Sequence, residues 1–205
     1  MGTRRSLGGS VAVDQITRHR RRGLITAIAG AVAANAHAQP SAQGFIDAWQ
    51  SQALQIGAAS AGVAQARCDA LASSLIDIPT MAVSAASQAR LALTPARQAR
   101  LVAQVRSFVD RNCVARRAQS AGSSLQLLGV RPAAGGQMTI TAAASGPRGA
   151  SHRVAWRVAP TAGGYRALDV MVDGVSLTAQ ISATLERLTA QFGDADAAIQ
   201  ALGRG

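Results

Sequence analysis

Acid–base chemistry has three candidate side chains in the chain beyond residue 38. His152 is the only histidine there, and Asp169 and Asp173 lie four residues apart in a strand-like segment and its turn. Because side chains alternate along a strand, both carboxylates would face the same side and could form an acid–base pair. Hydrogen bonding to turn amides is the simpler interpretation, and no serine or cysteine pairs with a positioned base. We therefore favour a protein that is not an enzyme, with a small-ligand enzyme as the alternative.

Other chemical signatures are missing from the sequence pattern. The pairs Gly135-Gly136 and Gly163-Gly164 fall between strand-like segments, as in hairpins, and not between a strand and a helix, where phosphate loops form. Arginines do not alternate with aromatic residues as they do in proteins that bind single-stranded nucleic acid. We expect no metal, no cofactor and no nucleic-acid partner.

The two cysteines, Cys68 and Cys113, form an even pair whose spacing does not suit zinc. In an oxidising compartment they could form a disulfide, and two buried free thiols are the alternative.

Residues 1–38 have the features of a secretory signal. A basic segment from Arg18 to Arg22 precedes the apolar stretch Leu24 to Ala34, and Ala36-His37-Ala38 has the form of a cleavage site. The apolar stretch is too short to cross a bilayer core, which takes roughly 20 residues. The segment Arg21 to Ile25 also resembles a twin-arginine export motif. We expect an exported single domain, residues 39–205, with a buried or amphipathic N-terminal helix as the alternative.

Composition favours a packed domain of low charge. Hydrophobic residues make up 48% of the chain and aromatic residues only 3%, so the core must consist mainly of alanine and aliphatic side chains. Six of the 21 basic residues and one of the ten acidic residues precede residue 39. The remaining net charge of about +6 is ordinary for an exported protein near an anionic membrane.

The first part of the domain has helical periodicity, and a second helical region closes it. Thr94 is an expected N-cap, with Pro95 in the first turn of a long helix. Helices are expected at 45–57, 58–74, 80–91, 95 to beyond 113, 182–191 and 194–202.

From residue 123 the hydrophobic period changes to two. Four strands are expected at 124–131, 137–144, 152–158 and 165–172. Their short connections predict an antiparallel meander. Alternation places three apolar residues on one face of each of the last two strands: Val154, Trp156 and Val158, then Leu168, Val170 and Val172. The predicted fold is α+β, with N-terminal helices, a four-stranded antiparallel meander sheet and C-terminal helices enclosing an apolar pocket.

Small residues in the covering helices leave volume over the apolar face of this sheet. A concave apolar cavity of that kind suits an apolar ligand. A structural envelope protein with a filled core is the alternative.

The run from Val154 to Leu177, VAWRVAPTAGGYRALDVMVDGVSL, resembles the signature of the MlaC, or toluene-tolerance, family. There a Trp-Arg pair leads through a Gly-Gly hairpin to an aromatic residue and then to Asp-Val-x-Val-acid-Gly-Val-Ser-Leu, which is Asp169 to Leu177 here. Weaker matches are FIDAWQSQAL, SSLIDIPTMA and GDADAAIQAL. The helix after Leu177 departs from the family pattern. The family usually has an aromatic-Arg-x-x-Phe group there, and this chain has Ile181, Ser182 and Leu185 at the equivalent positions.

This resemblance implies a periplasmic phospholipid-binding carrier. Such a protein would pass phospholipid between an outer-membrane lipoprotein complex and an inner-membrane ABC transporter, which maintains the lipid asymmetry of the outer membrane. Another lipid, such as a hopanoid, is the alternative ligand. We expect the Asp173-Gly174 turn to set the mouth of the pocket. The expected wall is apolar: Trp156, Val158, Leu168, Val170, Val172, Val175, Leu177 and Ile181.

Overall fold

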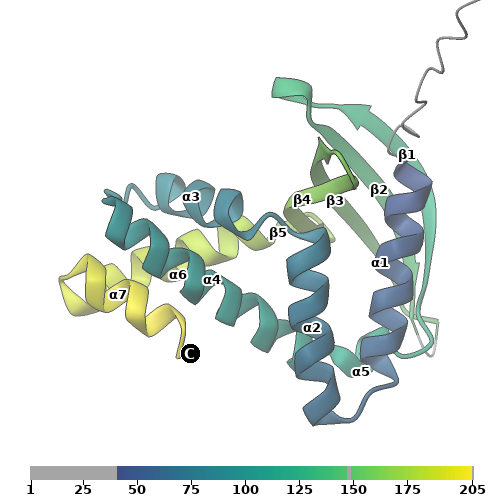
Figure 1. The fold of residues 1–205 in the computed structure, drawn as a ribbon, viewed down its shortest axis with the longest axis horizontal. Coiled ribbons are helices and arrows are strands. Elements are labelled where there is room, and N and C mark those ends of the chain that lie inside the picture. Colours follow the sequence, from purple (N-terminus) through teal and green to yellow (C-terminus); the bar gives the residue numbers. More distant parts are fainter. Residues whose placement is uncertain (1–40, 147–148, 205) are drawn as a thin grey trace, which may run out of the picture. The chain divides into compact units, whose positions relative to one another are not determined.

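The computed structural model describes residues 41–146 and 149–204, and the predicted signal peptide, residues 1–38, lies outside them. An antiparallel sheet in the order β1-β2-β3-β4-β5 is packed against helices that precede and follow it in the chain (Figure 1). The α+β class is confirmed, but the sheet has five strands where four were predicted. Within the described ranges, no helix combines the length and the hydropathy needed to span a membrane.

The helices are α1 (Ala42–Gly57), α2 (Ala61–Leu75), α3 (Ile78–Gln88), α4 (Pro95–Ala115), α5 (Arg117–Ser120), α6 (Leu177–Phe192) and α7 (Ala195–Leu202). The strands are β1 (Ser124–Pro132), β2 (Met138–Ser145), β3 (Ser151–Thr161), β4 (Gly164–Val172) and β5 (Val175–Ser176), and the 3₁₀ turn η1 (Ala134–Gly136) joins β1 to β2.

Capping side chains set the starts of the helices. Thr94 Oγ1 accepts a hydrogen bond from the amide of Arg97 at 3.2 Å at the start of α4, which confirms the predicted cap. Helix α6 begins at Leu177, earlier than predicted, because Ser176 Oγ accepts from the amide of Ala179 at 3.1 Å. The signature segment therefore runs directly into a helix.

The fifth strand depends on the Asp173-Gly174 turn. These residues have φ values of 51° and 84°, as in a tight hairpin turn. The chain folds back at this turn, and Val175 pairs with Val172. A strand of two residues is too short for alternation to reveal, which is why the sequence predicted only four.

Strand β4 contains a bulge that breaks the predicted alternation. Arg157 pairs with Asp169, whereas Val158 pairs with Ala167, so Leu168 is an extra residue in β4. Ala167 consequently lies in the main apolar cluster, and Leu168 is buried outside that cluster. The prediction of strict alternation along β4 was wrong at this point.

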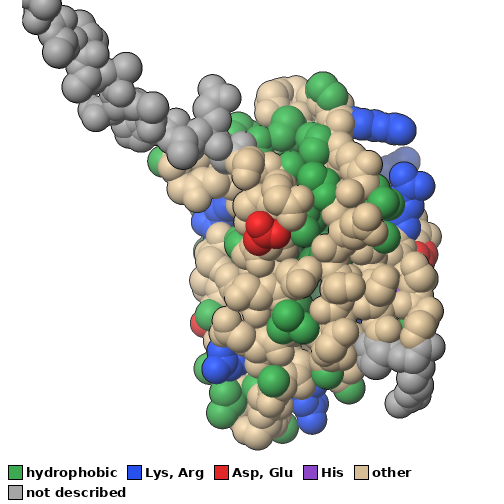
Figure 2. All heavy atoms as spheres, turned by 90° about the vertical axis from the view of Figure 1, so that its right-hand side faces the viewer, with side chains coloured by type: hydrophobic (Ala, Val, Ile, Leu, Met, Phe, Trp, Pro, Cys, Tyr) green, Lys and Arg blue, Asp and Glu red, His purple; other side chains and the backbone are tan. Residues whose placement is uncertain are grey.

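Helices α1 and α2 lie against the sheet, and α3, α4, α6 and α7 form a second group of helices (Figure 1). A continuous apolar core joins the two groups, and its largest fully buried side chains include Trp156, Ile46, Met81, Leu101 and Ile181. On the edge strand β1, Leu128 and Val130 are exposed. Figure 2 shows the side of the molecule on which β1 and β2 lie, where hydrophobic side chains gather in a band.

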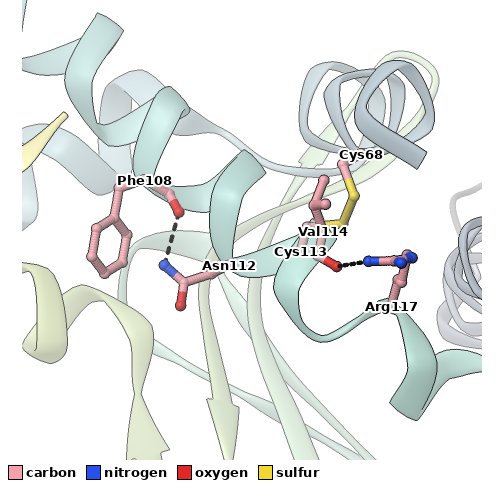
Figure 3. The surroundings of a disulfide bond; sticks show 6 residues. All are labelled: Cys68, Phe108, Asn112, Cys113, Val114 and Arg117. Carbon is pink, nitrogen blue, oxygen red and sulfur yellow. Dashed lines mark hydrogen bonds between the residues drawn. A yellow bond between two sulfur atoms is a disulfide. The ribbon is translucent and has the colours of Figure 1, made fainter. Parts of the chain in front are cut away.

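A disulfide joins the two groups of helices. Cys68 of α2 is bonded to Cys113 of α4, the pairing expected from the sequence (Figure 3). Nearby on α4, Asn112 donates a hydrogen bond to the carbonyl of Phe108 at 2.8 Å. Because the cysteines are separated by 45 positions in the sequence, loop-closure entropy assigns the crosslink about 4 kcal/mol of stabilisation. The bond therefore fixes α4 to the helix that borders the cavity described next.

Candidate ligand-binding site

A cavity of about 440 Å³ lies between the start of α1 and the hairpin that joins β3 to β4. This volume is within the range of about 300–1,000 Å³ that is usual for ligand pockets. Four segments line the cavity: the first turns of α1 (Ser41, Gly44, Phe45, Ala48), the end of α2 (Ser74, Leu75), the hairpin (Thr161, Ala162, Gly163, Gly164) and the start of β4 (Tyr165, Arg166).

The hairpin leaves this space open because glycines occupy its tip. Gly164 has a φ of 138°, which side chains rarely tolerate, and a Cβ on Gly163 or Gly164 would meet no heavy atom within 4 Å. Larger residues at the two positions would extend into the space around the hairpin. The turn therefore needs glycine at position 164, and both glycines line the cavity.

Two aromatic side chains, Phe45 and Tyr165, line the cavity, and two tryptophans pack behind Phe45. The ring of Phe45 packs edge-on against Trp156 at a centroid distance of 5.8 Å, and Trp49 packs against Trp156 at 5.3 Å. Tyr165 lines the cavity and contacts Met138 on β2, with 4.0 Å between the hydroxyl oxygen and the sulfur. An apolar ligand in the cavity would lie against Phe45, with the aliphatic core behind it.

The polar side of the cavity contains one charged residue, Arg166. Its Nη2 donates to the backbone carbonyls of Ser73 at 2.6 Å and Ile76 at 2.7 Å, at the end of α2. Its Nε is buried and has no hydrogen-bond partner among the described residues. Asp77 also ties this region to β4, because its amide donates to the carbonyl of Ala167 at 2.8 Å.

None of the eight residues predicted to form the pocket wall lines this cavity. Trp156, Val158 and Ile181 are fully buried in the core, Leu168 is buried beside it, and Val170 and Leu177 are partly buried against it. Val172 is 38% exposed and Val175 is 55% exposed. The predicted mouth at Asp173-Gly174 follows the last residue of β4, whereas the cavity borders the first residues of this strand.

The three acid–base candidates do not converge. Asp169 is 6% exposed, and it accepts hydrogen bonds from Ser176 Oγ at 2.6 Å and from both the amide and the hydroxyl of Thr178 at 3.0 and 2.9 Å. Asp173 instead pairs with His152 Nδ1 at 2.7 Å on an exposed surface. The hydrogen bond from His152 lowers the pKa of Asp173. Both carboxylates accept hydrogen bonds from backbone amides: Asp169 from Thr178 in the first turn of α6, and Asp173 from Arg153 on β3 at 2.8 Å. The simpler interpretation expected turn amides, and these partners lie in a helix and a strand instead.

Sequence reasoning missed the cavity residues on α1 and at the start of β4. Two signals for them were present: the Gly163-Gly164 pair was part of the family signature, and Phe45 begins one of the weaker matching segments. Neither signal shows that the two segments meet, because they are far apart in the chain.

The chain forms an α+β domain with a cavity of about 440 Å³ that is lined by apolar side chains, hydroxyl groups and one arginine. The family model of the MlaC protein matches residues 41–204, so the chain belongs to the MlaC family. The solved structure of a phospholipid-binding protein from Ralstonia solanacearum, in complex with a phospholipid, has the same fold, with a TM-score of 0.64. The two chains are 16% identical, and the match covers 80% of this chain and 96% of the other. The comparison with curated protein sequences finds no match.

Proposed function

We propose that this protein binds a phospholipid and carries it through the periplasm between the outer and inner membranes. Membership of the MlaC family and the fold shared with the R. solanacearum phospholipid-binding protein support this ligand class. An outer-membrane lipoprotein complex and an inner-membrane ABC transporter are the proposed partners, and lipid asymmetry of the outer membrane is the proposed result. The protein carries its ligand without changing it chemically.

The cavity beside Phe45 is the observation that carries this proposal. A phospholipid with two long acyl chains is larger than this cavity of about 440 Å³. The chains therefore need Phe45 to turn aside, which opens the cavity towards Trp156 and the aliphatic core. Burial of each CH₂ group contributes about 0.8 kcal/mol, which favours such an opening when lipid enters.

Native mass spectrometry of the protein purified without detergent tests the proposal. We expect a mass increase that corresponds to one phospholipid, and lipid extraction then gives its class. Ala48→Trp, which fills the cavity from α1, should abolish this increase. Ser51→Trp is the matched control, because Ser51 is exposed on the same helix. A wild-type protein without lipid, or lipid retained equally by the two variants, would contradict the proposal, and a bound hopanoid would replace phospholipid as the ligand.

A further inference from the structure

The cavity has a strong asymmetry of charge. Its other polar side chains are the hydroxyl groups of Ser41, Ser74, Thr161 and Tyr165, and Arg166 is its only charged lining residue. No carboxylate lies among the residues that line it. An anion in this cavity would therefore meet the positive charge of Arg166 and no carboxylate among the described residues that line it.

Among the described residues no carboxylate pairs with Arg166, and the C-terminal end of α2, whose carbonyls it binds, offsets its positive charge only in part. Both of its acceptors among the described residues, Ser73 O and Ile76 O, are uncharged carbonyls. These two bonds hold Nη2 at the end of α2 and so restrict the guanidinium plane. The Nε–H remains buried without an acceptor, and an unmet donor of this kind is unfavourable until an acceptor reaches it.

Helix α1 adds a second positive element at the same place. Ser41 caps this 16-residue helix, and both Ser41 and Gly44 line the cavity, so the N-terminal end of α1 borders the ligand space. The first turn of α1 contains no acidic residue. The positive end of the helix dipole is therefore available to an anion.

We propose that Arg166, together with the start of α1, binds the phosphate of the phospholipid head group, while the acyl chains enter past Phe45. This inference rests on the proposed function and adds to it the chemistry that selects the ligand. A phosphate has the oxygen acceptors that guanidinium N–H groups bind best. Lipids with the same acyl chains and no phosphate should bind more weakly.

Competition between two lipids with identical acyl chains tests this proposal. Delipidated protein is exposed to vesicles that contain equal amounts of phosphatidylglycerol and diacylglycerol, and the bound lipid is identified by mass spectrometry. The wild type should prefer phosphatidylglycerol by about tenfold or more. Arg166→Gln should lose this preference and still bind diacylglycerol, whereas Arg131→Gln, an exposed control on β1, should keep it.

Each other outcome overturns the proposal in a recognisable way. If the wild type binds both lipids equally, the proposed phosphate contact is wrong, while the proposed carrier function is unaffected. This comparison uses the wild type alone and so does not depend on the folding of a variant. If Arg166→Gln binds less of both lipids to the same extent, Arg166 has a structural role and does not select the phosphate. A wild type that binds neither lipid overturns the proposed function itself. Inorganic phosphate alone is the last probe, because an Arg166-dependent rise in Tm with phosphate, without a lipid preference, would assign the site to free phosphate.

Discussion

At its first residues, Gly164 to Arg166, strand β4 borders an open cavity, and three residues further along, at Asp169, it is fixed by a buried network. The carboxylate of Asp169 connects β4, the Ser176 cap and the first turn of α6. The cavity end has glycines and a guanidinium without a charged partner. The comparison shows that the most recognisable segment of the chain, Asp169 to Leu177, maintains the fold. We propose ligand binding at the less recognisable end of the same strand, which borders the cavity.

Phe45→Ala should have the largest effect, because Phe45 separates the cavity from Trp156. Truncation of a buried phenylalanine costs about 3–5 kcal/mol of stability. The same change should speed lipid uptake, since the acyl chains no longer displace the ring. Urea unfolding measures the stability, and the fluorescence of Trp49 and Trp156 on addition of lipid measures the uptake.

Phe108→Ala on α4 is the control for this change, because Phe108 is partly buried and does not line the cavity. It should lower stability and leave the uptake rate unchanged. Equal uptake rates in the wild type and Phe45→Ala would show that Phe45 is not the barrier.

Asp169→Ala should lower stability by about 3 kcal/mol, because a buried acceptor with charge-assisted hydrogen bonds is lost. Asp169→Asn should cost less, since the amide oxygen can replace Oδ1, which accepts from Val170 and Thr178. The folded fraction of both variants should bind lipid as the wild type does. Loss of lipid from folded Asp169→Asn would place binding at this end of β4.

Asp110→Asn should act in the opposite direction to Asp169→Asn. Asp110 on α4 is 8% exposed, its Oδ1 has no hydrogen-bond partner among the described residues, and burial together with nearby Asp69 raises its pKa. A folded-state pKa above the unfolded value means that stability is lost as the pH rises through the folded-state pKa. The variant should therefore gain about 1 kcal/mol at pH 7, or about 3 °C in Tm.

This gain should disappear below about pH 3.9, where the carboxyl is protonated in the unfolded chain as well. Asp47→Asn, an exposed change on α1, is the matched control and should leave Tm unchanged at both pH values. A lower Tm for Asp110→Asn at pH 7 would mean that the ionised carboxylate is stabilising.

Val175→Asp should have the smallest effect, a change within about 0.5 kcal/mol, because Val175 is 55% exposed. Lipid content should also stay the same. This variant tests directly which end of β4 contacts the lipid, since a charge placed in a pocket wall would reduce lipid retention strongly. If the folded variant retained less lipid, the result would support the pocket that was first predicted from the sequence.

Local patterns predicted most of the fold. Periodicity predicted the long helices and four strands, and the residue types at Thr94 and Pro95 predicted the cap of α4. The cap at Ser176 was not predicted, so the start of α6 was placed too late. Strand β5 and the bulge at Leu168 involve one or two residues, too few to alter a periodic pattern. The cavity was beyond sequence reasoning for another reason: it forms where Phe45 and Arg166, which are distant in the chain, come together.

Photocrosslinking with a phospholipid that carries a diazirine in its acyl chain tests the central claim most directly. Peptide mass spectrometry of the irradiated complex shows which end of β4 lies against the lipid. We predict crosslinks on the α1 peptide that contains Phe45 and on residues around Trp156 and Tyr165. Crosslinks concentrated at Val172 and Val175 would contradict the assignment of the cavity beside the β3–β4 hairpin as the lipid site.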